Sequence, residues 1–162
     1  MPTIPAGELV GRDPVLARLS LLVERVARGE RVTVVISGEA GIGKSTLLRA
    51  VGAHADEQGV SIAWGTCVDL PGAPAYWPWS RAFDEMVRER GASVVREAAG
   101  DDLALLSPVL SGLGGPLPTL DDQRGQLLAM DATGRLLDTL AREQPQLILL
   151  DDLQWADPST LT

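Results

Sequence analysis

Cysteine, lysine and long hydrophobic runs are all scarce in this chain of 162 residues. The single cysteine, Cys67, excludes an internal disulfide and fits a reducing compartment, so we expect a cytoplasmic protein. The longest aliphatic runs, residues 32–36 and 147–150, are far shorter than the roughly 20 residues of a transmembrane helix. The first 13 residues lack the basic and apolar regions of a signal peptide, so no membrane partner is expected.

Clustered basic residues are absent as well. Fourteen basic residues against 22 acidic ones give a net charge of −8. Because nucleic-acid phosphates are bound by clustered cations, we expect no direct nucleic-acid contact from this segment. Lys44 is the only lysine, and the other 13 of the 14 basic residues are arginine. This exception indicates a position where a compact ammonium serves better than a planar guanidinium.

The chain does have enough apolar sequence for one folded domain, being 45% hydrophobic. Apolar spacing and terminal residues predict helices at about 13–29, 44–58, 80–90, 93–99, 102–110 and 119–142. Thr119 and Asp122 resemble a capping box that opens the last of these helices. Aliphatic and β-branched runs predict three strands, at 32–36, 60–67 and 147–150. This order of elements predicts an α/β fold, with a parallel sheet flanked by helices.

The segment GEAGIGKS, residues 38–45, matches the phosphate-loop pattern G-x-x-x-x-G-K-[ST]. Glycines let the backbone N–H groups approach a phosphate, and the helix beginning at Lys44 adds the positive end of its dipole. Lys44 is expected to reach the β- and γ-phosphates, and the Ser45 hydroxyl to bind Mg²⁺. Thr46 stands where a dinucleotide fingerprint needs its third glycine, which excludes that motif. The predicted ATP-binding residues of the loop are Gly38, Glu39, Ala40, Gly41, Ile42, Gly43, Lys44, Ser45 and Thr46.

Two carboxylates, Asp151 and Asp152, close the aliphatic run at 147–150. A buried strand that ends in an acid directs it toward the edge where α/β folds bind ligands. Asp151 is expected to hold Mg²⁺ through water, and Asp152 to orient or deprotonate the attacking water, with Lys44 as its catalytic partner. A buried strand with a polar exit is the commoner explanation of such a pattern alone. The phosphate loop about a hundred residues upstream favours the functional interpretation, that of a P-loop NTPase.

Four segments together resemble one family: VGRD at 10–13, GEAGIGKST at 38–46, PAYWPW at 74–79 and LLDDLQWADPSTL at 149–161. They are similar to the STAND class of AAA-type ATPases, and to the origin-recognition-like module that opens large ATP-binding LuxR-type transcriptional regulators. The resemblance implies that Val10, Gly11 and Arg12 contact the nucleotide base. Many hydrolysing relatives carry Glu where this chain has Asp152, which favours slow turnover and a switch.

The resemblance also implies that a further strand lies between the 32–36 and 147–150 strands, and that a winged-helix lid follows. We therefore expect residues 1–162 to be the N-terminal part of an ATPase domain, weak as an enzyme and prone to self-association. Within it we expect a lead-in segment and helix at 1–30, a phosphate-loop unit at 31–67, a loop and helical insert at 68–118, and a helix with the acid-bearing strand at 119–162. The partners would be ATP or ADP and the rest of the same polypeptide.

Three functions stay open at this point. The first is an ATP- and Mg²⁺-operated switch in a larger signalling or transcriptional regulator, with slow ATP hydrolysis. The second is a P-loop small-molecule kinase, and the third is a nucleotide-binding interaction module that does not hydrolyse. The second acid, Asp152, favours the first over the second because a kinase has no need of a group placed for water. Nothing in the sequence distinguishes a DNA-binding output from a cyclase or kinase output.

Structural roles are the commoner explanation for several other conspicuous residues. The aromatics of the 74–79 segment are expected to pack in a loop or core rather than to stack on a base. Cys67 is expected to be a small buried residue at a strand end. Asp157, before Pro158, is expected to cap a helical turn.

Overall fold

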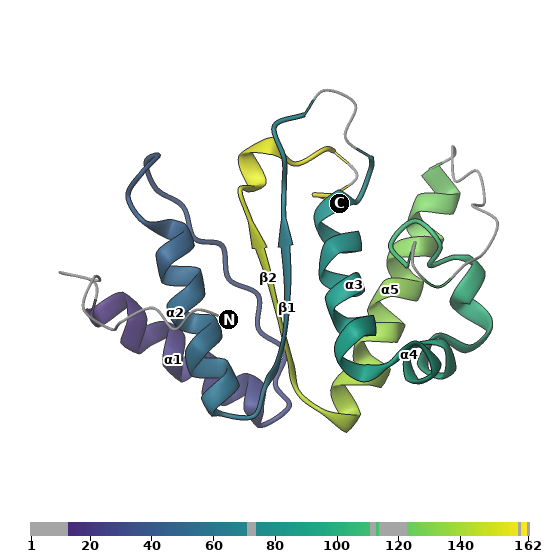
Figure 1. Ribbon diagram of the computed structural model, residues 1–162, viewed down its shortest axis with the longest axis horizontal. Coiled ribbons are helices and arrows are strands. Elements are labelled where there is room, and N and C mark those ends of the chain that lie inside the picture. Colours follow the sequence, from purple (N-terminus) through teal and green to yellow (C-terminus); the bar gives the residue numbers. More distant parts are fainter. Residues whose placement is uncertain (1–12, 71–73, 111–112, 114–122, 159, 162) are drawn as a thin grey trace.

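The computed structural model describes residues 13–70, 74–110, 113, 123–158, 160 and 161, and all statements below concern these residues. Five α-helices, two strands and two 3₁₀ helices follow in the order α1 (Asp13–Ala27), α2 (Lys44–Glu57), β1 (Ser61–Thr66), α3 (Trp77–Arg90), α4 (Ala92–Ala99), η1 (Gly100–Ala104), α5 (Gln123–Glu143), β2 (Gln146–Asp151) and η3 (Leu153–Trp155). In Figure 1, α1 and α2 lie on one side of the strands, and α3, α4 and α5 lie on the other.

The two strands are parallel neighbours, paired from Ser61 opposite Gln146 to Thr66 opposite Asp151. Residues of β1 alternate between buried and half-buried, which is the period of a strand with two unlike faces. Helices α1 and α2 precede β1, and α3, α4 and α5 lie between the strands along the chain. The predicted α/β architecture with a parallel sheet flanked by helices is therefore confirmed.

The prediction of a strand at residues 32–36 is wrong. This segment has no strand assignment, and the described sheet holds only β1 and β2. Val34 is 47% exposed and Val35 is 79% exposed. Ile36 nevertheless packs against the same core cluster as Ile62 of β1 and Leu147 of β2. A strand needs a partner for its backbone groups, and none of the described residues provides one here.

The boundaries of other elements depart from prediction where proline or short-range turns intervene. Helix α3 begins at Trp77, three residues earlier than expected, because Pro78 fits the first turn of a helix. The helix expected at 102–110 is instead the 3₁₀ helix η1 followed by turns. The capping box expected at Thr119 and Asp122 lies outside the described residues, and so does the rest of the 114–122 segment.

Two apolar clusters cover the two faces of the sheet. The larger one joins α3, α4 and α5, with Phe83, Leu106, Leu136 and Leu140 almost inaccessible to solvent. The smaller one joins α1 and α2 to the sheet around Val23, and its buried members are Leu19, Val23, Leu47, Val51, Ala55 and Val60. Helix α2, which follows the predicted phosphate loop, is thus anchored in a core rather than standing free.

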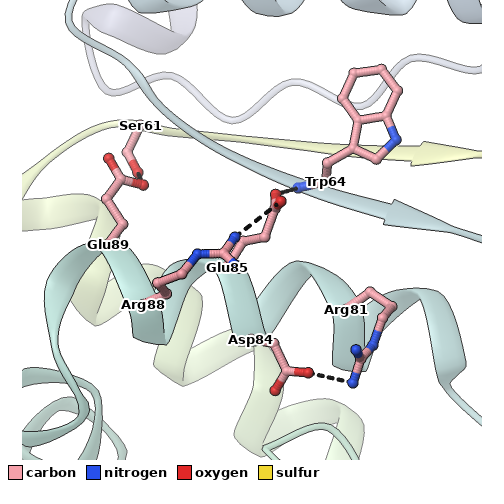
Figure 2. Close-up of polar contacts among 7 residues, drawn as sticks. All are labelled: Ser61, Trp64, Arg81, Asp84, Glu85, Arg88 and Glu89. Carbon is pink, nitrogen blue, oxygen red and sulfur yellow. Dashed lines mark hydrogen bonds and ion pairs between the residues drawn. The ribbon is translucent and has the colours of Figure 1, made fainter. Parts of the chain in front are cut away.

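The outer edge of β1 is covered by carboxylates from α3 (Figure 2). The Trp64 N–H donates to Glu85 Oε2 at 2.7 Å, and the Ser61 hydroxyl donates to Glu89 Oε2 at 2.9 Å. Glu85 is also paired with Arg88 at 3.2 Å. An exposed strand edge is a template for pairing with other chains, and a carboxylate on one of its N–H groups opposes that pairing.

Candidate functional site

The predicted phosphate loop lies between the extended 32–36 segment and α2. Gly41 and Gly43 have φ angles of +75° and +90°, a left-handed backbone that side chains with a Cβ rarely adopt. Gly43 immediately precedes α2, and no side chain caps that helix end. The first N–H groups of a helix have no partner within the helix, so this end is suited to a bound anion.

Lys44 folds back across the loop that precedes it. Its Nζ donates to the carbonyl oxygens of Gly38 at 3.0 Å and Glu39 at 2.9 Å. In both hydrogen bonds the acceptor is a neutral backbone carbonyl and not a carboxylate. Ser45 and Thr46 follow in the first turn of α2, and both are half-buried. The loop therefore combines an ammonium, a hydroxyl and a helix N-terminus within three consecutive residues.

The two predicted acids differ in their surroundings. Asp151 is the last residue of β2 and is only 8% exposed, and its Oδ1 accepts a hydrogen bond from the Asp152 N–H at 2.9 Å. Asp152 leaves the strand with φ +58° and ψ +38°, a left-handed conformation that is unusual for a residue other than glycine. Its Oδ1 accepts a hydrogen bond from Gln154 Nε2 at 3.0 Å. One carboxylate is thus buried at the strand end, and the other is presented by a constrained turn.

The predicted phosphate loop and the acids lie at one end of the molecule. Figure 1 shows the loop before α2 and the residues after β2 at the upper end of the view, where β1 and β2 both terminate. This is the carboxyl edge of a parallel sheet, the usual place for ligands in α/β folds. Val10, Gly11 and Arg12, predicted to contact the base, lie outside the described residues.

Cys67 lies beside the acids, which sequence reasoning did not anticipate. Its N–H donates to the Asp151 carbonyl oxygen at 3.0 Å, and the residue is 4% exposed. Burial raises the pKa of the thiol above its ordinary value of 9.0, and the negative charges of Asp157, Asp152 and Asp151 raise it further. The prediction of a small buried residue at a strand end is confirmed. Three carboxylates therefore act electrostatically on this thiol.

A cavity of about 180 Å³ adjoins this edge on the α3 side. Its lining comes from the residues after β1, the start of α3 and the segment after β2, namely Cys67, Val68, Leu70, Pro74, Trp77, Pro78, Trp155, Ala156 and Asp157. The aromatic segment at 74–79 thus packs against the segment that follows the acids. Nothing in the sequence indicated this contact beyond the fact that both segments belong to the motifs that resemble the ATPase family.

The donor set limits what kind of metal site is possible. Among the described residues, no group of three or more His, Cys, Asp or Glu side chains is arranged to hold a metal ion. Mg²⁺ usually takes one or two protein ligands and completes its shell with water and substrate phosphates. Ser45 and Asp151 fit that mode of binding, because each would supply one oxygen.

A sequence model of the AAA ATPase domain matches residues 8–162. The chain belongs to this family. An AAA ATPase domain is a nucleotide-binding module, and the small parallel sheet flanked by helices agrees with that assignment.

One curated relative of this AAA ATPase domain is an uncharacterized protein of Rhizobium meliloti (strain 1021). It is 25% identical over 173 residues, which cover 95% of this chain but only 16% of the relative. The chain therefore spans about a sixth of the length of that relative. No solved structure gives a significant match. No helix in the described part of the chain is long and apolar enough to cross a membrane.

Proposed function

We propose that this AAA ATPase domain is an ATP- and Mg²⁺-dependent switch that belongs to a larger signalling or transcriptional regulator of the STAND class and hydrolyses ATP slowly. The observation that carries the proposal is the shared position of the loop around Lys44 and the acids Asp151 and Asp152 at one end of the sheet. An ammonium and a helix N-terminus suit a triphosphate, and a buried carboxylate suits its Mg²⁺.

In this proposal each residue has a separate task. Lys44 releases the Gly38 and Glu39 carbonyls and turns to the β- and γ-phosphates. The loop from Gly38 to Thr46 would surround those phosphates, and Ser45 and Asp151 would be the residues that hold Mg²⁺. Mg²⁺ neutralises charge on the transferring phosphoryl group when it is bound. Asp152 orients the attacking water, and its bond to Gln154 directs its carboxylate.

Slow hydrolysis follows from the geometry proposed for Asp152. The aspartate side chain is short, and one of its oxygens already accepts a hydrogen bond from Gln154. These features also favour the alternative of a nucleotide-binding module that does not hydrolyse. Turnover separates the two, because a switch releases phosphate with water as the only acceptor, whereas a binding module releases none.

The experiment that tests nucleotide binding is a titration with a fluorescent ATP analogue. Lys44→Ala should weaken binding by at least tenfold, since charge-assisted hydrogen bonds contribute roughly 1.5–3 kcal/mol each. Arg49→Ala is the matched control, because it removes an exposed cation from the same helix, five residues further along. Equal affinities in the parent and Lys44→Ala would refute the proposed role of the loop.

A separate observation supports a further strand in the complete ATPase domain. Val34 and Val35 are exposed in a segment without secondary structure, and the described sheet holds only β1 and β2. We propose that a further strand of the same polypeptide lies between this segment and β2 in the complete ATPase domain. Such a strand would pair the free edge of β2 and cover both valines.

A further inference from the structure

The segment that follows β2 is tied to the first turn of α3, although the two are 81 residues apart in the sequence. The Trp79 indole N–H donates to the Thr160 carbonyl oxygen at 3.2 Å. Trp79 is half-buried and packs against Phe83, with the ring centroids 6.5 Å apart. Thr160 is 7% exposed. The bond is therefore made in a largely closed environment between a helix anchored in the core and a short, irregular segment.

Two separate sets of local hydrogen bonds lie between the acids and Thr160. Asp157 accepts from both the N–H and the hydroxyl of Thr160, which confirms its predicted capping role. Nearer the strand, the Trp155 N–H donates to the Asp152 carbonyl oxygen at 2.9 Å. Residues 152–158 thus begin with a short turn that follows β2, and Thr160, which bonds to Asp157, is held by Trp79.

Asp152 needs such support because its backbone is left-handed. A residue with a Cβ adopts φ +58° at a conformational cost, and the conformation persists only where surrounding contacts hold it. The 3₁₀ helix η3, which begins immediately after Asp152, has three residues and little stability of its own. The anchor at Thr160 lies outside η3 and joins the segment to helix α3.

We propose that Trp79 is a positioning residue for Asp152: through Thr160 and Asp157 it holds the turn that presents the Asp152 carboxylate to water. The inference rests on the proposed function, in which Asp152 orients the attacking water. Trp79 itself touches no nucleotide in this proposal. The aromatic segment at 74–79 then serves catalysis by holding the acid-bearing segment in place.

Trp79→Phe tests this inference in the 162-residue chain. It removes the N–H donor and keeps an aromatic ring beside Phe83. Trp77→Phe is the matched control, because Trp77 lies in the same helical turn and also lines the adjoining cavity. Its ring centroid lies 4.7 Å from the Arg81 guanidinium carbon. The measurements are amide hydrogen exchange, the dissociation constant for Mg-ATP and the rate of phosphate release.

We expect the Trp155 and Thr160 amides of Trp79→Phe to exchange about tenfold faster, the size of effect that loss of one hydrogen bond supports. Amides of α2 should be unchanged. The rate of phosphate release should fall about tenfold, while the dissociation constant for Mg-ATP stays within about twofold. The reason is that Trp79 positions Asp152, which orients the attacking water, and not the residues proposed to bind the nucleotide. Trp77→Phe should leave both the exchange and the rate as in the parent.

Several results would overturn the inference. One is unchanged hydrogen exchange at Trp155 and Thr160, and another is an equal effect in the two variants. If the parent hydrolyses ATP, a third is faster exchange in Trp79→Phe without a lower rate of phosphate release. If the parent binds or hydrolyses no ATP, the proposed function fails, whereas faster exchange confined to Trp79→Phe still supports the positioning contact. Should Trp79→Phe not fold, Thr160→Val removes only the hydroxyl bond to Asp157, and unchanged exchange at Trp155 in that variant would refute the proposal.

Discussion

Replacing Gly65 by alanine should destabilise the domain strongly, although alanine is normally the better residue within a strand. Gly65 lies in β1, directly beneath the first turn of α3. A Cβ at this position would stand 2.0 Å from the Pro78 carbonyl oxygen, 2.7 Å from the Pro78 carbonyl carbon and 3.0 Å from Leu150 Cδ2. Two of these three atoms belong to the backbone of a helix, so no side-chain rotation relieves the contact.

The expected magnitude follows from two opposing terms. Removing glycine from a strand interior gains roughly 0.5–1 kcal/mol of stability through the unfolded chain. Overpacking a closed site costs about 1–3 kcal/mol and sometimes more, and a clash with buried Pro78 lies at the upper end of that range. The net loss should therefore be about 2–3 kcal/mol, a large part of the roughly 5–15 kcal/mol by which domains are stable.

Urea denaturation followed by circular dichroism measures this effect. The control is Gly134→Ala in α5, where an added Cβ would meet no atom within 4 Å. That variant should be more stable than the parent by about 0.5–1 kcal/mol, because glycine weakens a helix interior. If Gly65→Ala unfolds at the same urea concentration as the parent, the close approach of α3 to β1 is not present in solution, and the packing described here is wrong.

Three further predictions concern the acids, the thiol and the sheet edge. Asp152→Asn should retain Mg-ATP and lose hydrolysis, whereas Asp151→Asn should weaken the Mg²⁺ dependence of binding itself; identical profiles in the two variants would refute the separate roles. Burial and the nearby carboxylates raise the pKa of Cys67, so the unfolded chain loses the thiol proton first and stability should fall as the pH rises through the ordinary value of 9.0. Cys67→Ala should remove that part of the alkaline loss in urea midpoints, and an equal loss in both proteins would contradict it. A longer stretch of the parent polypeptide that carries the proposed strand should protect the Val35 amide from hydrogen exchange and should bind ATP more tightly, and equal protection in the two lengths would count against the strand.

The sequence could predict the features that depend only on residues close together along the chain. Helix α2 begins at Lys44 as expected, because glycines before it and the apolar stripe within it act over a few residues. The phosphate-loop motif is likewise contiguous, and so its position at a helix N-terminus followed from the pattern alone. Strand β2 with its terminal acid was predicted because a fully apolar run followed by a carboxylate is a local signal too.

Tertiary structure alone decided the features that depend on a distant partner. Residues 32–36 have the composition of a strand, yet a strand exists only where another backbone pairs with it, and among the described residues none does. The bond from Trp79 to Thr160 joins segments that are far apart along the chain. The electrostatic effect of three carboxylates on Cys67 has the same origin. Side-chain pattern determines which local structures are possible, whereas contacts across the fold determine which backbone groups are paired and which charges meet.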